Sequence, residues 1–126
     1  MTRMTTLALA ALLSGLAAAP LHADDAVSTS VADLYKDKSS LGGRQVNVQG
    51  KVVKVNNHIM QRNFIHIQDG TGNAADGTND LTITTQDDVA VGDQVSASGT
   101  LLLDQDFGFG YRYSLLLEQA RVTKAR

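Results

Sequence analysis

The chain has 126 residues, of which 43% are hydrophobic, and its formal net charge is −2 at neutral pH. A chain of this length points to one domain. Its slight negative charge argues against tight, non-specific binding to long nucleic acid, because such binding depends on neutralising phosphates. The sequence contains no cysteine, so disulfides, thiolate metal sites and cysteine nucleophiles are excluded.

The first residues have the pattern of a secretory signal peptide. Arg3 supplies a positive charge, and residues 7–19 form an apolar run that is too short to span a membrane. Small residues follow, and cleavage is expected after Ala23; a retained anchor is the alternative. The expected organisation is a signal peptide over 1–23, a flexible N-terminal tail over 24–29 and one domain over 30–126. The product would be periplasmic or secreted, with no membrane attachment after cleavage.

A short helix is expected at the start of the domain. Residues 28–30 offer three hydroxyl groups that can cap it, and apolar side chains follow at helical spacing from Val31. Gly42 and Gly43 are expected to end this helical segment.

After residue 43 the apolar side chains recur at every second position, which is typical of strands. Gly50 interrupts the first alternating run and is expected to mark a bulge or a sharp bend. The expected strands are five: 44–56, 63–69, 81–85, 94–103 and 111–124. Short strands of mainly antiparallel type, separated by glycine bends, predict a small barrel.

Three motifs carry a resemblance to a known fold family. They are "GRQVNVQGKV" in the first strand, "FIHIQDGTG" in the second strand and its turn, and "VGDQVSASG" at the fourth strand. The chain resembles the OB-fold, in the branch that includes anticodon-binding domains. More narrowly, it is similar to small exported bacterial OB-fold proteins labelled as nucleic-acid-binding or nucleotide-binding. The resemblance implies an all-β, five-stranded antiparallel Greek-key OB-fold barrel with a short N-terminal helix.

The resemblance also implies where a ligand binds. OB-folds bind ligands over strands 2 and 3, between the loop that joins strands 1 and 2 and the loop that joins strands 4 and 5. Here those loops are "NNHIMQ" and "DQDFGFGY", and the alternation places Thr82 and Thr84 on the same outer face. The expected contacts are basic and aromatic: Lys51, Lys54, Arg62, Phe64, His66, Phe107, Phe109 and Tyr111.

Basic and aromatic side chains together are typical of proteins that bind single-stranded nucleic acid, because the bases stack on exposed rings above a positive groove. The leading hypothesis is therefore a binding module for single-stranded nucleic acid, a nucleotide or another anionic ligand. The alternative interpretation of the aromatic residues is a minor core that covers the ends of the barrel. Asp104 and Asp106 reduce the positive potential at the second loop.

Met60 and His66 raise a second hypothesis, which is a copper site. Thioether and imidazole groups suit copper, and His58 lies in the adjoining loop. The protein would then be a metal-handling or protein-docking accessory of a periplasmic redox system. The alternative is that Met60 plugs the mouth of the barrel and that His66 is a surface residue. A third hypothesis is a protein-interaction module that uses the "DQDFGFGY" loop and binds no small ligand.

The polar loop after the second strand contains oxygen ligands that calcium prefers, but their spacing does not fit a calcium-binding loop, and a solvated turn is expected. These residues are Asp69, Asn73, Asp76, Asn79 and Asp80. Catalysis finds little support, because no serine–histidine–aspartate order is distinctive and Glu118 is the only glutamate. The sequence predicts a protein that is not an enzyme.

Overall fold

The computed structural model describes residues 26–125. The expected signal peptide, and the part of the expected tail that precedes Ala26, lie outside the described residues. Helix α1 spans Val31–Lys36 and helix α2 spans Lys38–Leu41. Ser30 caps α1, because its side chain accepts a hydrogen bond from the Asp33 backbone N–H. The helical segment thus starts and ends where the sequence predicted.

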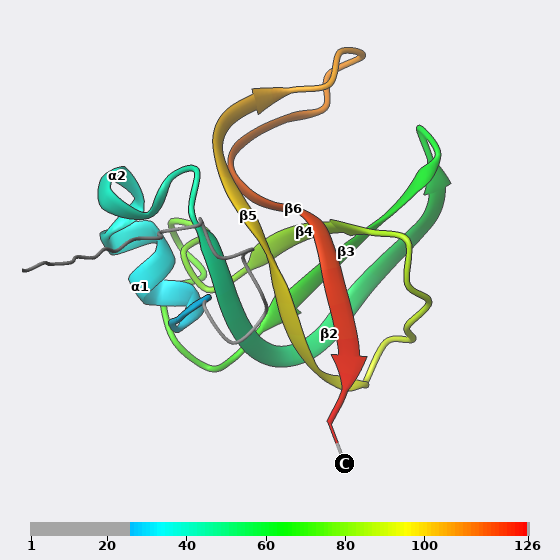
Figure 1. Ribbon diagram of the computed structural model, residues 1–126, viewed down its shortest axis with the longest axis horizontal. Helices are drawn as coiled ribbons and strands as arrows, with labels where there is room; N and C mark the ends of the chain where they lie inside the picture. The colour runs from blue at the N-terminus through cyan, green and yellow to red at the C-terminus, as the bar shows by residue number, and fades with distance from the viewer. Residues whose placement is uncertain (1–25, 126) are drawn as a thin grey trace, which may run out of the picture.

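The rest of the described chain is mainly β-structure. The strands are β1 (Val27–Ser28), β2 (Gln45–Ile59), β3 (Arg62–Gln68), β4 (Leu81–Thr85), β5 (Gln94–Asp106) and β6 (Arg112–Lys124). They form one sheet in the order β1-β2-β3-β4-β6-β5, and an additional pairing between β2 and β5 closes the bonding into a ring. Figure 1 shows β2 curving under the other strands and both long hairpins rising from the same side.

This arrangement confirms an all-β, barrel-like architecture and corrects its details. The sheet has six strands rather than five, and it is mixed rather than purely antiparallel. Strand β1 runs parallel to β2, and β4 runs parallel to β6. The parallel pairing of β4 with β6 was not visible in the sequence, because alternation within a strand does not reveal which strand lies beside it.

Strand β1 also corrects the expected tail. Val27 and Ser28 pair with Val46 and Asn47, and the Thr29 N–H donates to the Asn47 carbonyl at 3.0 Å. Residues 27–29 are therefore part of the sheet. Their sequence gave no strand signal, because a pair of residues is too short to show a period.

Strand β2 joins the two halves of the ring. Its first half pairs with β5 and its second half pairs with β3, and Lys51 belongs to both ladders. Of the two alternatives expected at Gly50, the bulge is wrong, because Gly50 is paired with Val95 and the register shift falls between Val52 and Lys54. The other alternative, a bend, agrees with the change of partner strand at Lys51. A glycine is required at position 50 for a different reason, because a Cβ there would lie 2.9 Å from the Gln68 carbonyl oxygen.

A second irregularity lies in β6. Ser98 of β5 is opposite Arg121, whereas Thr100 is opposite Glu118, so β6 has one more residue than its partner at this point. Gln119 occupies the bulge with a φ of 51°. The same shift appears in the pairing of β6 with β4. Bulges of this kind bend a strand and increase its twist, which helps the sheet to close.

The core is formed by the inner face of the strands together with the helices, which lie beside the start of β2 (Figure 1). Its fully buried members include Val31, Leu34, Val46, Val48, Val52, Ile65, Ile67, Leu81, Ile83, Leu101 and Leu117. Alternate residues of β2 and β5 point away from this core, and they form the outer surface on which ligand sites are sought. Within residues 26–125, no helix has the length and apolar character needed to cross a membrane.

Candidate functional site

Four rings form an aromatic cluster on the outer side of β3: Phe64, Phe107, Tyr111 and Tyr113. Phe64 is at its centre, with ring centroids 5.6 Å from Phe107, 6.2 Å from Tyr111 and 6.0 Å from Tyr113. Phe64 is only 2% exposed. Its predicted role as a direct ligand contact is therefore wrong, because the other three rings cover the face on which a base would stack.

The cluster agrees with the alternative interpretation of these aromatic residues as a minor core, but only in part. Phe107 and Tyr113 are half-buried, whereas Tyr111 is 38% exposed and remains accessible at the edge. Burial, and then the charge of neighbouring Tyr111, raise the pKa of Tyr113. The Tyr113 phenol is therefore neutral at physiological pH.

The loop between β5 and β6 places these rings. The Phe107 N–H donates to the Tyr111 carbonyl at 2.8 Å, and the Tyr111 N–H donates to the Gly108 carbonyl at 2.9 Å. These bonds close a tight turn and leave Phe109 at its tip. Phe109 is 95% exposed and has a φ of 56°, which is an unfavourable conformation for a side chain of this size. Of the expected aromatic contacts, Phe109 is thus the most accessible.

Arg62 connects the cluster to a charged group. Its guanidinium carbon lies 5.2 Å from the centroid of the Phe107 ring, which is a cation–π distance. One terminal nitrogen is 3.8 Å from a carboxylate oxygen of Glu118. Arg62 is therefore fixed over the aromatic cluster, and part of its charge is already balanced by Glu118.

Lys54 and Lys51 extend the positive charge along β2. Lys54 is opposite His66, and Lys51 is opposite Gln68. Both lysines are exposed, and among the described residues neither forms an ion pair. Since Phe64 is opposite Asn56, Lys54 lies one step from the cluster on the same face, and Lys51 lies farther away.

His66 belongs to a polar network that is structural in character. Its Nδ1 is 2.6 Å from an Asp80 carboxylate oxygen, and Gln68 donates to the other oxygen at 3.1 Å. The Tyr35 hydroxyl donates to the Asp80 backbone carbonyl at 2.6 Å. Burial, and then the charge of Asp80, raise the pKa of Tyr35. The network joins helix α1 to β3 and to the segment before β4.

The two residues of the copper hypothesis lie at different places along the β2–β3 hairpin. Met60 follows the last residue of β2, and His66 lies four positions after Arg62 on β3. Four strand residues span about 13 Å, and the Nδ1 of His66 is already bonded to Asp80. The described residues also contain no group of three histidine, cysteine or carboxylate side chains that could hold a metal. The copper hypothesis for Met60 and His66 therefore stays a prediction.

Two threonines expected on the ligand face are instead buried. Thr82 is 7% exposed and Thr84 is 1% exposed. The Thr84 hydroxyl accepts a hydrogen bond from the Gln119 N–H at 3.0 Å, and the neighbouring Thr85 hydroxyl donates to the Ala120 carbonyl at 2.7 Å. These hydroxyls satisfy the backbone of the β6 bulge, which is a structural role that the alternating pattern could not reveal.

The acidic loop forms internal hydrogen bonds. The Asp69 carboxylate accepts from the Val31 N–H at 2.9 Å and from the Thr71 N–H at 3.0 Å. Burial alone would raise the pKa of Asp69, but these bonds and that from the Thr71 hydroxyl outweigh it, so the pKa lies below its usual value. Asp76 accepts hydrogen bonds from both the hydroxyl and the N–H of Thr78. The loop thus shapes its own turn and caps α1.

Sequence reasoning missed two members of this face. Tyr113 stacks on Phe64, and Glu118 pairs with Arg62. The signal for Tyr113 was present, because Tyr111 and Tyr113 are separated by one residue and so belong to the same face of a strand. Glu118 had no such signal, since its pairing with Arg62 depends on the β6 bulge beside it.

Comparisons with known proteins bear on the fold. No family model matches the chain, and no curated protein matches it. The chain is similar in structure to "a putative aspartyl-tRNA synthetase from Leishmania major Friedlin", with a TM-score of 0.52 and 11% sequence identity. The match covers 90% of this chain and only 24% of that protein. At this identity the likeness shows the fold alone, and it fits the expected OB-fold-like architecture.

Proposed function

We propose that this protein is an exported OB-fold module, without enzymatic activity, that binds short single-stranded nucleic acid or a related anionic aromatic ligand. The ligand would bind at the aromatic–basic face, which we define as Lys51, Lys54, Arg62, Phe107, Phe109 and Tyr111. Its structural neighbour is described as a putative aspartyl-tRNA synthetase, which is compatible with a nucleic-acid ligand.

The observation that carries the proposal is the position of Arg62 above Phe107, which belongs to the same loop as the accessible Tyr111 and Phe109. A guanidinium fixed on a ring supplies a flat, positive surface, and an exposed aromatic next to it supplies a stacking partner for a base. The cost of holding Phe109 at a positive φ supports the same conclusion, because strained and exposed residues cluster at binding sites.

The charge balance predicts weak binding. Arg62 is already paired with Glu118, and Arg112 is paired with Asp106, so Lys51 and Lys54 supply most of the unbalanced positive charge. For single strands the logarithm of the affinity falls with the logarithm of the salt concentration, with a slope of about −0.7 per neutralised phosphate. With contacts from Lys51, Lys54 and Arg62 the slope would be about −2.

The test is a titration of the protein with a short, fluorescently labelled pyrimidine oligonucleotide, followed by anisotropy at several salt concentrations. Phe109→Ala should weaken binding about tenfold, since stacking contributes about 1–3 kcal/mol per base. Lys51→Glu combined with Lys54→Glu should also weaken binding and make the salt slope less steep.

A matched control separates a local site from a general effect of charge. Lys36→Glu with Lys38→Glu makes the same charge change on exposed residues of the helical segment, and it should leave most of the affinity intact. If both lysine pairs reduce the affinity equally, or if the wild-type protein gives no anisotropy change at low salt, the proposed function is rejected.

One observation favours a second function, which is docking to another exported protein. Phe109 is an exposed ring at the tip of a tight turn, and a protruding aromatic of this kind is typical of a binding hot spot. Protein docking through Phe109 would depend little on salt. In a binding assay with an isolated partner, Phe109→Ala would then abolish binding, whereas the Lys51 and Lys54 changes would have no effect.

A further inference from the structure

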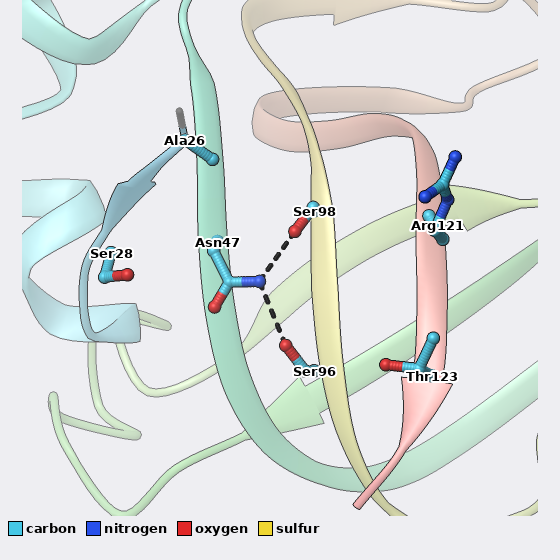
Figure 2. Close-up of a pocket in the computed structure, with 7 residues that line it drawn as sticks. All are labelled: Ala26, Ser28, Asn47, Ser96, Ser98, Arg121 and Thr123. Carbon is cyan, nitrogen blue, oxygen red and sulfur yellow. Dashed lines mark hydrogen bonds between the residues drawn. The ribbon is translucent and has the colours of Figure 1, made fainter. Parts of the chain in front are cut away.

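A second surface of the molecule has the features of a small ligand site. It is a hollow of about 490 Å³ over β1, β2, β5 and β6, lined by Ala26, Ser28, Asn47, Ser96, Ser98, Arg121 and Thr123. It contains no residue of the aromatic–basic face. Figure 2 shows these side chains on four neighbouring strands, with Asn47 turned toward β5.

The strand register explains the hollow. Ser28 pairs with Asn47, Asn47 with Ser98, and Ser98 with Arg121, so these four side chains form a row across the sheet. Ser96 pairs with Thr123 in the next row. All but Arg121 are short, so they leave a depression, which is the hollow. The longer Arg121 is exposed and belongs to the same surface.

The hydrogen bonds of Asn47 decide what this hollow presents to a ligand. The Asn47 side-chain amide donates to the Ser96 hydroxyl oxygen at 2.9 Å and to the Ser98 hydroxyl oxygen at 2.6 Å (Figure 2). Each serine oxygen therefore already accepts one bond, and its own proton stays available for donation. Both serines thus have an O–H donor that these two bonds leave free for a ligand.

The charged side chain that the described residues contribute to the hollow is positive. Among residues 26–125, Arg121 is the only ionisable residue that lines the hollow, and no carboxylate of this part of the chain lines it. A guanidinium presents several N–H donors in a fixed plane, which matches the oxygens of carboxylate and phosphate groups. Hydroxyl donors at the base and a guanidinium beside them are complementary to a negatively charged group that is rich in acceptor oxygens.

We propose that this hollow binds a small oxyanion, namely the phosphate or carboxylate group of a small molecule, through Arg121, Ser96 and Ser98. The proposal goes beyond the proposed function and does not depend on it, because the two surfaces share no residue. Ser28 and Thr123 stand at the sides of the hollow, where they are placed to contact the remainder of such a molecule.

The test is an NMR amide titration of the protein with inorganic phosphate, repeated with acetate, with sodium chloride at matched ionic strength as the reference. The expected result is a saturable shift at Asn47, Ser96, Ser98 and Thr123 that chloride does not reproduce. Saturation with phosphate indicates a phosphate group, and saturation with acetate alone indicates a carboxylate group. No saturable shift with either anion overturns the proposal.

Variants link the shift to the hollow. Arg121→Gln should weaken anion binding at least about tenfold, because it removes charge-assisted hydrogen bonds, and Arg121→Lys should retain more affinity than Arg121→Gln. Ser98→Ala should weaken binding severalfold. Arg44→Gln removes an exposed arginine outside the hollow and should have little effect. Equal losses in the Arg44 and Arg121 variants would show non-specific attraction and would also overturn the proposal.

Discussion

At the scale of single residues, Phe64 shows that a side chain on the outer face of a strand is not always accessible to a ligand. It lies on the outer side of β3, where the alternation predicted it, yet it is covered by three rings from the end of the β5–β6 hairpin. The binding capacity of the face therefore depends on the rings above Phe64, whereas Phe64 holds them in place.

This difference predicts a large loss of stability when Phe64 is replaced and a small change when Phe109 is replaced. Phe64→Ala should lower the free energy of unfolding by about 3–5 kcal/mol, because it opens a cavity beneath Phe107, Tyr111 and Tyr113. Phe109→Ala removes a ring that is 95% exposed, and the change should stay within about 0.5 kcal/mol. Urea unfolding followed by circular dichroism measures both. A loss below about 1 kcal/mol for Phe64→Ala would contradict its buried role.

At the scale of elements, the loop between β3 and β4 stabilises helix α1 from outside. Asp69 accepts a hydrogen bond from the Val31 N–H, and the Thr71 hydroxyl accepts one from the Ala32 N–H. These are the first backbone donors of a helix, which its own carbonyls cannot satisfy. A negative carboxylate at this end is also favoured by the helix dipole. The loop predicted as a solvated turn thus has a structural role.

The capping carboxylate predicts a dependence of stability on pH. The pKa of Asp69 is lower in the folded state than its ordinary value, so the folded state favours the ionised form. This contribution is fully present above the unfolded pKa, near 4, and is lost as the pH falls through the folded pKa. Asp69→Ala should cost about 1 kcal/mol at neutral pH, and this difference from the wild type should shrink below about pH 3.

Urea unfolding of both proteins at neutral and acidic pH measures the effect. Asp88→Ala is a suitable control, since it removes an exposed carboxylate that lies in another loop. A difference between the wild type and Asp69→Ala that is the same at every pH would indicate lost packing rather than a lost charged cap.

Features that depend on residues close together in the chain could be predicted from the sequence, whereas features that depend on distant residues could not. A helix cap within residues 28–30 and the alternating strands depend on neighbours within a few positions, so the sequence revealed them, and the structure identifies Ser30 as the cap. The Gln119 bulge and the pairing of Arg62 with Glu118 depend on strands that are distant in the chain, and no local pattern encodes them. For the candidate site, the sequence correctly placed Arg62, Phe107 and Tyr111 together, but it could not show that the same rings would cover Phe64.

At the scale of the whole molecule, closure of the sheet depends on how closely β5 and β6 approach each other at Gly99. Gly99 is paired with Val46 of β2 on one side and faces the β6 bulge on the other. A Cβ at this position would lie 2.8 Å from the Glu118 carbonyl oxygen and 3.0 Å from the Ala120 Cα. Both contacts are with backbone, so no side chain can rotate away to make room. The close approach thus allows β5 to pair with β2 on one side and with β6 on the other.

Gly99→Ala should therefore lower the free energy of unfolding by about 1–3 kcal/mol, which is the usual cost of overpacking. Because the strain acts where β2, β5 and β6 meet, the transition should remain cooperative, with the dependence on urea concentration unchanged. Gln94→Ala, an exposed change in the same strand, should alter stability by less than about 0.5 kcal/mol. If Gly99→Ala proved neutral, the tight contact with β6 would not be needed for closure, and the bulge at Gln119 alone would have to account for the bend.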